Sequence, residues 1–450
     1  MGRLFGTDGI RGIANHYPMT AEMAMKTGMA VGRLMCCGDA ATSMVVVGKD
    51  TRISGDMLAQ AVCAGICSMG VNVMMADIMP TPGVAYLTAS VKASAGIMVS
   101  ASHNPYTDNG IKIFDSQGHK LSQDREKELE QMILDAPDAP DAPAADRDPG
   151  RVFHQQDLQD RYVDFLVGAI PPAEGLSLVI DCANGATYGV AARVFPGAHL
   201  MNAAPDGINI NRECGSEHPG PLAEAVLTHQ ADAGFAFDGD GDRVVAADET
   251  GTILSGDRLL ALCANYMKEK GTLAQNTVVS TVMSNIGLTR ALTEMDIAHV
   301  KTDVGDRHVL EKMLSSGAVI GGEDSGHMIF TDYQTTGDGI LTALMICRVM
   351  HDTGKPLSEL ADCMTLYPQT LINVAVLEKP AIESIPAIQQ AIAAAETALG
   401  EEGRVLVRYS GTQAMCRVMV EGPTHDVIQR HADTIASAIR KNIGDLRGEG

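Results

Sequence analysis

The sequence predicts an α/β protein with three similar α/β domains, built on parallel or mixed sheets, and a smaller C-terminal α+β domain. Strand-like apolar runs alternate with helix-like segments over most of the 450 residues, which is typical of sheets covered by helices. The order of strand, small-residue loop and helix begins three times, near Met44, Ser177 and Thr277. A chain of this length is also too long for one hydrophobic core.

Individual segments support this order. In the first domain, MVVVGKDTR predicts a strand and a loop, DMLAQAVCAGICSMG a helix, and VNVMMADI a second strand. In the second, LQDRYVDFLVGAI predicts a helix, LSLVIDCANGA a strand with a loop, and YGVAARVF a helix. In the third, NTVVSTVMSNIG and IAHVKTDVG predict strands on either side of a helix near residues 288–295.

The clearest domain boundary is the stretch DAPDAPDAPAADRDPG at residues 135–150. Repeated Asp-Ala-Pro cannot bury apolar surface or continue a helix, so we expect a surface linker. After Pro368 the pattern changes, because QTLINVAVLEK, RVLVRY and MCRVMVEG predict three strands that alternate with two helices. We therefore predict four domains, at residues 1–150, 151–254, 255–368 and 369–450.

Composition argues against nucleic acid and membranes as partners. The net charge is −22, Trp is absent and aromatic residues make up only 4%, so neither a basic surface nor base-stacking platforms are expected. The apolar stretch from Ala61 to Met79 is interrupted by glycines and polar residues and predicts a helix followed by a strand, not a membrane span.

The ten cysteines contain no C-x-x-C pair, which favours buried, reduced thiols. The first residues contain no apolar signal-peptide core, and Gly6 does not fit the myristoylation pattern. We expect a soluble cytoplasmic protein.

The stretch VSASHNPYTDNGIKIF, residues 99–114, predicts a loop between two strands. Pro105 excludes Asn104 from the helical region, and Asn109-Gly110 favours a tight return. Ser102 is therefore expected at a strand end. From these residues alone it is a nucleophile, a helix cap or a polar turn residue.

A second loop, DGDGDR, places Asp238, Asp240 and Asp242 two residues apart between strand-like runs. Three adjacent carboxylates repel one another unless a cation or solvent compensates. A solvated acidic turn is one alternative. An EF-hand is another, because Glu249 falls at the twelfth position, but Arg243 stands where that loop needs Gly. We favour a metal site, and oxygen ligands from a short loop suit Mg²⁺.

Further polar loops carry groups suited to sugar phosphates. RYSGTQAMCR combines hydroxyl and backbone donors with two arginines that could chelate an oxyanion, unless it is a hairpin with exposed arginines. GGEDSGH is suited to sugar hydroxyls, although such loops are common. GTDGIRG and GKDTR add Arg11, Lys49 and Arg52, which a structural turn explains as well. The P-loop, the G-x-S-x-G elbow and the dinucleotide-binding G-x-G-x-x-G are absent.

In chain order, LFGTDGIRG, SASHNP, DGDGDR, GGEDSGH and RYSGT resemble the α-D-phosphohexomutase superfamily over the whole chain. Within it, FGTDGIRG, VGDRHVLEKM and TTGDG are similar to the bacterial phosphoglucosamine mutases. The resemblance implies four domains around a central cleft. It also implies interconversion of glucosamine 6-phosphate and glucosamine 1-phosphate on the route to UDP-N-acetylglucosamine and the cell wall, with Mg²⁺ and a glucosamine or glucose 1,6-bisphosphate activator.

The resemblance also assigns roles to individual residues. Ser102 corresponds to the phosphorylated serine and, with the three aspartates, to the Mg²⁺ site. Positive groups around the transferred phosphoryl correspond to Arg11, Lys112 and Arg243, and we hypothesise that Lys112 assists proton removal. His103 is expected to structure the loop. The sugar contacts correspond to Glu323, Ser325 and His327, and the phosphate loop to Arg408, Ser410, Gly411, Thr412 and Arg417.

Two departures from the family pattern affect the expected substrate. Asp324 replaces an amide residue in the sugar loop, and Gln413-Ala414 replace Glu-Pro in the phosphate loop. The alternatives are a mutase for glucose or mannose phosphates, a metal-dependent phosphatase that uses Ser102, and a catalytically inactive binding protein. The expected partner is a small phosphosugar, and the expected assembly is a homodimer.

Overall fold

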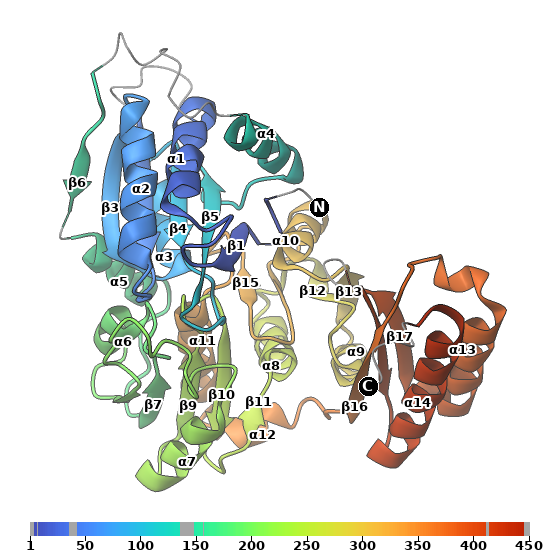
Figure 1. Cartoon of the computed structure of the whole chain (residues 1–450). Coiled ribbons are helices and arrows are strands. Elements are labelled where there is room, and N and C mark those ends of the chain that lie inside the picture. The colour runs from blue at the N-terminus through green and yellow to red at the C-terminus, as the bar shows by residue number, and fades with distance from the viewer. Residues whose placement is uncertain are drawn as a thin grey trace. The chain divides into compact units, whose positions relative to one another are not determined.

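The computed structural model describes residues 4–6, 8–35, 43–135, 148–155, 157–410 and 414–444. The chain forms two compact units, one from Met1–Met283 and Ile297–Cys363, the other from Ser284–Asp296 and Met364–Gly450. The first unit contains three mixed sheets with helices, and the second an antiparallel sheet with helices (Figure 1). The predicted α/β class with a C-terminal α+β module is confirmed.

The first sheet has the strand order β1-β5-β4-β2-β3-β6, in which β1 and β4 pair with β5 antiparallel and the other pairs are parallel. Its core packs helices α1, α2 and α4 against one face of the sheet, and α3 contacts β2 and β4 (Figure 1). The strands are β1 (Ile10–Ile13), β2 (Met44–Lys49), β3 (Asn72–Ile78), β4 (Ala95–Val99), β5 (Asp108–Asp115) and β6 (Val152–His154). The helices are α1 (Ala21–Met35), α2 (Gly55–Ser68), α3 (Thr81–Ser90) and α4 (Gln123–Leu134).

The second sheet has the order β11-β10-β9-β7-β8, with parallel pairs around β7 and antiparallel pairs around β10. Its strands are β7 (Leu178–Asp181), β8 (His199–Met201), β9 (Ala233–Phe237), β10 (Val244–Asp248) and β11 (Ile253–Leu254). The helices of this part are α5 (Leu158–Ala169), α6 (Tyr188–Val194) and α7 (Gly220–His229).

The third sheet has the order β13-β12-β14-β15, and only β14 and β15 pair antiparallel. Its strands are β12 (Thr277–Thr281), β13 (Ala298–Thr302), β14 (Ile320–Gly322) and β15 (Met328–Phe330). The helices are α8 (Gly256–Glu269), α10 (Asp306–Ser316), α11 (Gly339–Thr353) and α12 (Leu357–Ala361), with a 3₁₀ turn at Ala274–Asn276.

The three sheets share one feature that positions the chemistry. In each, an inner strand with one parallel neighbour is followed in the chain by its antiparallel partner, and a polar loop connects the two strands. These connections are β4–β5, β9–β10 and β14–β15. They carry the SHNP, DGDGDR and GGEDSGH motifs respectively, so the three chemical loops of the first unit occupy equivalent places.

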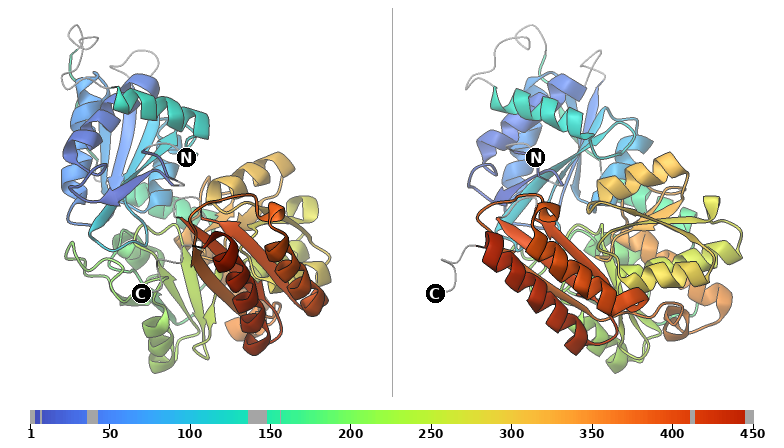
Figure 2. Two further views of the ribbon diagram at one scale, coloured as in Figure 1. Left: turned by 45° about the vertical axis from the view of Figure 1, so that its right-hand side comes forward. Right: turned by 90° about the vertical axis from the view of Figure 1, so that its right-hand side faces the viewer.

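The second unit contains an antiparallel sheet of order β16-β18-β17, with α13 and α14 on one face (Figure 2). Helix α9 (Ile286–Glu294) is grouped with this unit, where Asn285 and Ile286 donate to the buried carboxylate of Glu421. The remaining elements are β16 (Gln369–Ala375), β17 (Arg404–Tyr409), β18 (Met415–Glu421), α13 (Pro386–Leu399), α14 (His425–Ile443) and 3₁₀ turns at Ile382–Ser384 and Gly400–Glu402.

The predicted elements match the observed ones to within a few residues. The stretch from Ala61 to Met79 forms the end of α2 and then β3, as expected. No helix among the described residues is long and apolar enough to cross a membrane. Strand β6 extends the first sheet beyond residue 150, while residues 136–147 of the predicted linker lie outside the described part. The domain boundaries stay predictions.

The cysteines agree with the expected reduced thiols. Eight described cysteines are free, and six of them are buried. Burial raises the pKa of the Cys182 thiol to about 12, which keeps it protonated and unreactive. Cys36 and Cys37 lie outside the described residues.

Candidate active site

Ser102 lies just after β4 in a left-handed backbone conformation, with φ = 54°. This region is uncommon for residues other than Gly and is maintained here by local hydrogen bonds. The Ser102 N–H donates to Oγ of Ser100 at 2.9 Å, and the side chain of Asn211 donates to the Ser102 carbonyl at 2.8 Å. The residue is only 2% exposed. The predicted position at a strand end is therefore confirmed, in a rigid loop.

Arg52 anchors this loop through hydrogen bonds to its backbone carbonyls. Its guanidinium donates to the carbonyls of Ser102, Asn104, Pro105 and Asp108, and its Nε donates to Asp50 at 2.8 Å. All five N–H donors of the guanidinium are thus used. The GKDTR motif, for which ligand binding and a structural turn were both open, supplies a structural anchor through Arg52. Lys49 of the same motif pairs with Asp56 at 2.6 Å.

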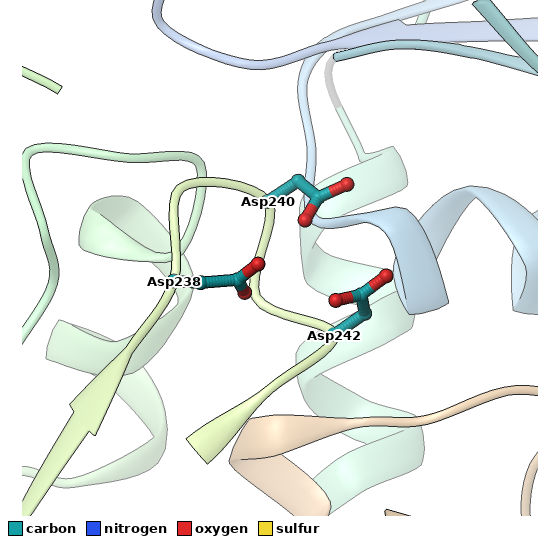
Figure 3. A group of neighbouring side chains, drawn as sticks. All are labelled: Asp238, Asp240 and Asp242. Carbon is teal, nitrogen blue, oxygen red and sulfur yellow. The ribbon is translucent and has the colours of Figure 1, made fainter. Parts of the chain in front are cut away.

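The three aspartates of the second loop point toward one another (Figure 3). Carboxylate oxygens of Asp238, Asp240 and Asp242 lie within 4.8 Å of one another, and the residues are at most 3% exposed. Gly239 permits this loop to approach the serine loop, because a Cβ there would lie 2.6 Å from the Ser102 carbonyl oxygen. Oδ2 of Asp238 consequently accepts the Ser102 hydroxyl at 2.5 Å.

The EF-hand alternative is wrong. Strands β9 and β10 flank the loop where an EF-hand requires helices. Glu249, the twelfth position of that reading, accepts hydrogen bonds from Ser358 instead of facing the aspartates. The solvated-turn alternative is equally inconsistent with carboxylates that are buried.

The aspartates fit a divalent cation. Oδ1 of Asp240 and Oδ1 of Asp242 are buried and have no hydrogen-bond partner, although three carboxylates crowd the site. Burial and the charges of Asp242 and Asp240 raise the pKa of Asp238 well above its usual value. A hard cation coordinated by carboxylate oxygens would remove both the repulsion and the unmet hydrogen-bonding demand.

Lys112 lies in the same site, as its place on the returning strand β5 predicted. Its Nζ lies 2.8 Å from Oδ2 of Asp240 and 3.0 Å from Oδ2 of Asp242. Burial disfavours the charged form, but these carboxylates and Asp8 hold the pKa of Lys112 well above its usual value. Lys112 is therefore an ammonium, which supplies charge but has no lone pair with which to accept a proton.

Arg11 reaches this group through Asp8. Its Nη2 lies 2.5 Å from Oδ2 of Asp8, and the same oxygen lies 3.2 Å from Nζ of Lys112. Oδ1 of Asp8 pairs with Lys120 at 2.6 Å. Burial raises the pKa of Asp8, but Lys112, Lys120 and Arg11 together bring it well below the usual value. Asp8 thus holds three cations at the edge of the aspartate cluster.

His103 and Arg243 form a second pair next to Ser102. Arg243 Nη1 lies 3.1 Å from Nδ1 of His103, which itself lies 3.4 Å from Oγ of Ser102. Burial and the charge of Arg243 lower the pKa of His103, so the imidazole is neutral at pH 7. The guanidinium also lies 3.6 Å from Glu217. This geometry agrees with a loop-structuring His103 and with a cation beside the serine hydroxyl.

The GGEDSGH loop joins the same site. His327 Nδ1 lies 3.7 Å from Oδ1 of Asp242, while the Gly337 N–H donates to its Nε2 at 3.0 Å. Nε2 therefore carries the lone pair, and Nδ1–H faces Asp242. Glu323 accepts from the Gly305 N–H at 3.1 Å, and the Ser325 hydroxyl is buried without a partner. An unpartnered hydroxyl beside a half-buried carboxylate suits hydrogen bonds to a polyhydroxylated ligand.

The arginines of the fifth motif belong to the second unit. Arg408 and Arg417 are directly opposite each other on β17 and β18. Burial and the neighbouring Arg417 lower the pKa of Arg408, and Arg417 Nε is buried without a hydrogen-bond partner. Like charges directly opposite each other are destabilising, so this pair suits an anion. Ser410 follows β17, whereas Gly411, Thr412 and Gln413 lie outside the described residues.

Several residues of the site were missed from the sequence. Asp8 and Asp306 fall inside motifs that had been singled out, but their partners are distant in sequence and left no visible signal. Thr81, at the start of α3, donates to Asp240 through its hydroxyl at 2.5 Å and through its N–H at 2.8 Å. Lys120, which bridges Asp8 and Asp306, gave no signal at all.

Comparison with known families agrees with this architecture. Four models of the phosphoglucomutase/phosphomannomutase family match the chain: alpha/beta/alpha domain I at residues 2–139, domain II at 160–251, domain III at 255–367, and the C-terminal domain at 371–438. Together they cover most of the sequence and place the three α/β sheets and the C-terminal sheet in separate domains of one family.

Similar proteins agree as well. Phosphoglucosamine mutase of Syntrophus aciditrophicus is 51% identical over 99% of this chain and 100% of the relative, and that of Anaeromyxobacter dehalogenans is 49% identical over 98% and 99%.

Among solved structures, a phosphoglucomutase/phosphomannomutase family protein from Burkholderia thailandensis superposes with a TM-score of 0.80 at 26% identity, covering 98% of both chains. N-acetylphosphoglucosamine mutase from Aspergillus fumigatus, solved with GlcNAc-6P and magnesium, shares the fold at 18% identity, with a TM-score of 0.69 and coverage of 98% and 96%. The chain belongs to the phosphoglucosamine mutases of the phosphohexomutase superfamily.

Proposed function

We propose that this protein interconverts glucosamine 6-phosphate and glucosamine 1-phosphate, with Ser102 as the phosphoryl carrier. The observation that supports this most directly is the hydrogen bond of 2.5 Å between the Ser102 hydroxyl and Asp238, at the edge of a buried three-carboxylate site. This contact supports a divalent cation beside the Ser102 hydroxyl. The relatives at about 50% identity carry the same activity in their names.

In the proposed reaction, the sugar hydroxyl at C1 attacks the phosphorus of phosphorylated Ser102. The bond from phosphorus to Ser102 Oγ breaks as the bond to the sugar oxygen forms, and the proton of the C1 hydroxyl passes to the departing Ser102 Oγ, which gives glucosamine 1,6-bisphosphate and a free serine hydroxyl. After the bisphosphate turns around, Ser102 Oγ takes the phosphoryl group from C6, its proton passes to the C6 oxygen, and glucosamine 1-phosphate leaves. Such transfer depends mainly on positioning and on neutralising charge.

The residues of the site have different roles in this phosphoryl transfer. Asp238, Asp240 and Asp242 would hold Mg²⁺, which supplies positive charge to the phosphoryl oxygens when bound. Lys112 and Arg11 add positive charge, and Arg243 lies beside the Ser102 hydroxyl. We assign charge neutralisation to Lys112 and not proton removal, because its neighbours hold it protonated. Glu323, Ser325 and His327 would contact the sugar.

The proposal also covers the C-terminal unit, the activator, the oligomeric state and the cellular location. Arg408 and Arg417 would hold the phosphate that is not being transferred, with Ser410, Gly411 and Thr412. A hexose 1,6-bisphosphate would activate the enzyme by phosphorylating Ser102. We further propose a cytoplasmic homodimer that supplies a precursor of UDP-N-acetylglucosamine and binds neither nucleic acid nor membranes.

The experiment compares turnover of the 6-phosphates of glucosamine, glucose and mannose by the native chain. The highest kcat/KM is expected for glucosamine 6-phosphate, and a higher value for another sugar would contradict the proposed substrate. Release of inorganic phosphate without any 1-phosphate would instead indicate a phosphatase. Asp324, which is exposed on the sugar loop, provides a sharper test. If its carboxylate favours the glucosamine ammonium, Asp324→Asn lowers the preference a few-fold, about 1 kcal/mol for an exposed charge pair.

A further inference from the structure

A cavity of about 650 Å³ lies in the first unit, between α4 and the end of β5 on one side and α10 and β15 on the other. Its volume falls within the range of about 300–1,000 Å³ that is typical of small-molecule sites. None of the residues proposed to bind the sugar phosphate or the cation lines it. Two motifs that the catalytic proposal leaves unused do: VGDRHVLEKM contributes Asp306 and Arg307, and TTGDG contributes Thr335 and Thr336.

The wall of the cavity has an apolar part and a cationic part. Leu121, Leu310, Leu314 and Ile329 supply the apolar surface. The charged lining consists of four cations, Lys92, Lys120, Arg125 and Arg307, and three carboxylates, Asp115, Asp306 and Glu311. The whole chain has 34 basic against 56 acidic residues, so this lining is less acidic than the protein as a whole, although Lys120, Arg125 and Arg307 each pair with a carboxylate. An organic anion with an apolar part matches such a lining.

Two helices begin at this cavity. Ser122, the N-cap of α4, and Arg125 in its first turn line one side, and Asp306 and Arg307 at the start of α10 line the other. Helix N-termini favour anions, although Asp124 and Glu126 in α4 and Asp306 in α10 already satisfy part of this preference, and an arginine in the first turn adds a charged donor.

Two polar groups in the wall lack partners. The Thr336 hydroxyl is buried without a hydrogen-bond partner, and the residue is 3% exposed. Arg307 donates to Glu126 through Nη2 at 2.5 Å, but its Nε is buried without a partner. Both groups can donate a hydrogen bond, so both are short of an acceptor oxygen. Phosphate oxygens of a ligand in the cavity would supply acceptors after a small shift of these side chains.

Lys120 connects the cavity to the catalytic site. Its Nζ lies 2.5 Å from Oδ2 of Asp306 and 2.6 Å from Oδ1 of Asp8. Asp8 in turn pairs with Lys112 and Arg11, and Asp306 lies 3.4 Å from His327. An anion that attracts Lys120 into the cavity therefore competes with Asp8, which pairs with the catalytic cations, and with Asp306, which lies beside the sugar loop.

We propose that this cavity is a regulatory site for a phosphorylated organic anion of nucleoside-diphosphate size, and that its occupancy changes turnover through Lys120. The phosphates face the cations and the two helix N-termini, and the apolar part of the ligand packs on Leu121, Leu310 and Leu314. A coupling of this kind changes the affinity or the rate by about 5- to 150-fold.

The test uses ADP as the probe and the full-length chain. Binding is measured by calorimetry in the Ser102→Ala background with saturating glucosamine 6-phosphate, so that the catalytic site is filled and turnover is stopped. ADP is expected to bind, and Arg125→Glu to weaken it about tenfold or more, as for loss of one charge-assisted hydrogen bond. Lys127→Glu is the matched control, because Lys127 lies on the same helix, pairs with Asp124 and does not line the cavity.

A second variant and measurements of turnover test the proposal further. Leu314→Trp, which narrows the cavity at an exposed apolar residue, is a second variant that is expected to exclude ADP. In the native enzyme, ADP is expected to change kcat or KM at least fivefold, and in the two cavity variants to have no such effect. The proposal is overturned if glucosamine 6-phosphate displaces ADP, if pyrophosphate binds as tightly as ADP, if Arg125→Glu and Lys127→Glu bind ADP equally, or if bound ADP leaves turnover unchanged.

Discussion

Two buried groups of charges adjoin the Ser102 loop, and they differ in how completely their polar atoms are hydrogen-bonded. In the first group, Asp50 and Arg52 form a fully buried pair in which every guanidinium N–H has an acceptor. In the second group, Asp240 and Asp242 each keep a buried oxygen without a hydrogen-bond partner. The first group is complete in the folded protein alone, whereas the second is complete only with a cation.

The difference in hydrogen bonding distinguishes a group that supports the fold, Asp50 and Arg52, from a group suited to the chemistry, the aspartate cluster. A fully bonded network resists change and fixes the strained Ser102 backbone. A partly bonded network of like charges costs stability and retains affinity for a ligand that completes it. The substitutions below disrupt one group or the other, and we expect different effects on stability and on activity.

The largest effect is expected on breaking the complete pair. Arg52→Met removes the buried charge that pairs with Asp50 and removes one or more donors from each of four loop carbonyls. Removing one partner of a buried pair typically costs about 3–5 kcal/mol, so we expect a large fall in the thermal midpoint with or without Mg²⁺. Arg52→Lys restores the charge but not the five-donor fork and should recover only part of the stability. A thermal midpoint of Arg52→Met equal to that of the native chain would show that the pair does not support the loop.

The next effect concerns the incomplete group. Asp240→Asn removes a proposed ligand and is expected to lower kcat by about 10³-fold, as for loss of a main electrostatic contact. In contrast to Arg52→Met, it should lower the midpoint of the metal-free protein only slightly, because relief of the repulsion among the carboxylates offsets the lost pair with Lys112, which keeps Asp242 and Asp8. Mg²⁺ at 100 times its dissociation constant should stabilise the native chain by about 2.7 kcal/mol and the variant far less. Asp232→Asn, at an exposed aspartate before β9, is the matched control. Equal stabilisation by Mg²⁺ in all three proteins would refute the metal site.

Substitution of Lys112 is expected to lower both activity and stability. Lys112→Met removes the ammonium that neutralises Asp240 and Asp242, so we expect kcat to fall by about 10²-fold and the metal-free midpoint to fall as well. Steady-state kinetics and thermal melts of the same preparation test both parts. Loss of activity in which the acidic limb of the pH profile disappears, with an unchanged midpoint, would support Lys112 as a base and contradict its assignment as a neutralising charge.

The smallest effect is expected from a third buried carboxyl outside both groups. Burial raises the pKa of Asp338 from 3.8 to about 6, although Leu341 N–H, Tyr162 and Gln334 donate to it. The folded state therefore binds this proton more tightly than the unfolded state, and the resulting stabilisation is lost as pH rises toward and through about 6. From pH 5 to pH 8 the loss is about 1.4 kcal/mol. Asp338→Asn, which keeps an N-cap for α11, should reduce the fall in thermal midpoint between these pH values. An unchanged fall would contradict the shifted pKa.

Sequence patterns predicted the parts of this site that are local in the chain. Alternating strands and helices gave the sheets, and the second apolar run after the serine loop predicted the returning strand on which Lys112 lies opposite Met98. The tight return expected at Asn109-Gly110 was wrong, because both residues lie inside β5 and the chain turns within residues 102–107. The aspartate loop was recognisable because its ligands are two residues apart. Bonds between distant segments were not predictable: Lys120 and Asp306 are separated by 186 positions, and Arg52 reaches carbonyls that any sequence would carry. The opposition of Arg408 and Arg417 follows from strand register and not from spacing alone.

The most direct test of the central claim, that Ser102 carries the phosphoryl group, is intact-mass analysis with localisation by peptide fragmentation after incubation with glucose 1,6-bisphosphate and Mg²⁺. One phosphoryl group on Ser102 is predicted for the native chain and none for Ser102→Ala, and only the native chain should form glucosamine 1-phosphate in a coupled assay. Glucosamine 1-phosphate formation by Ser102→Ala at the native rate, or a phosphoryl group on another residue, would contradict the account.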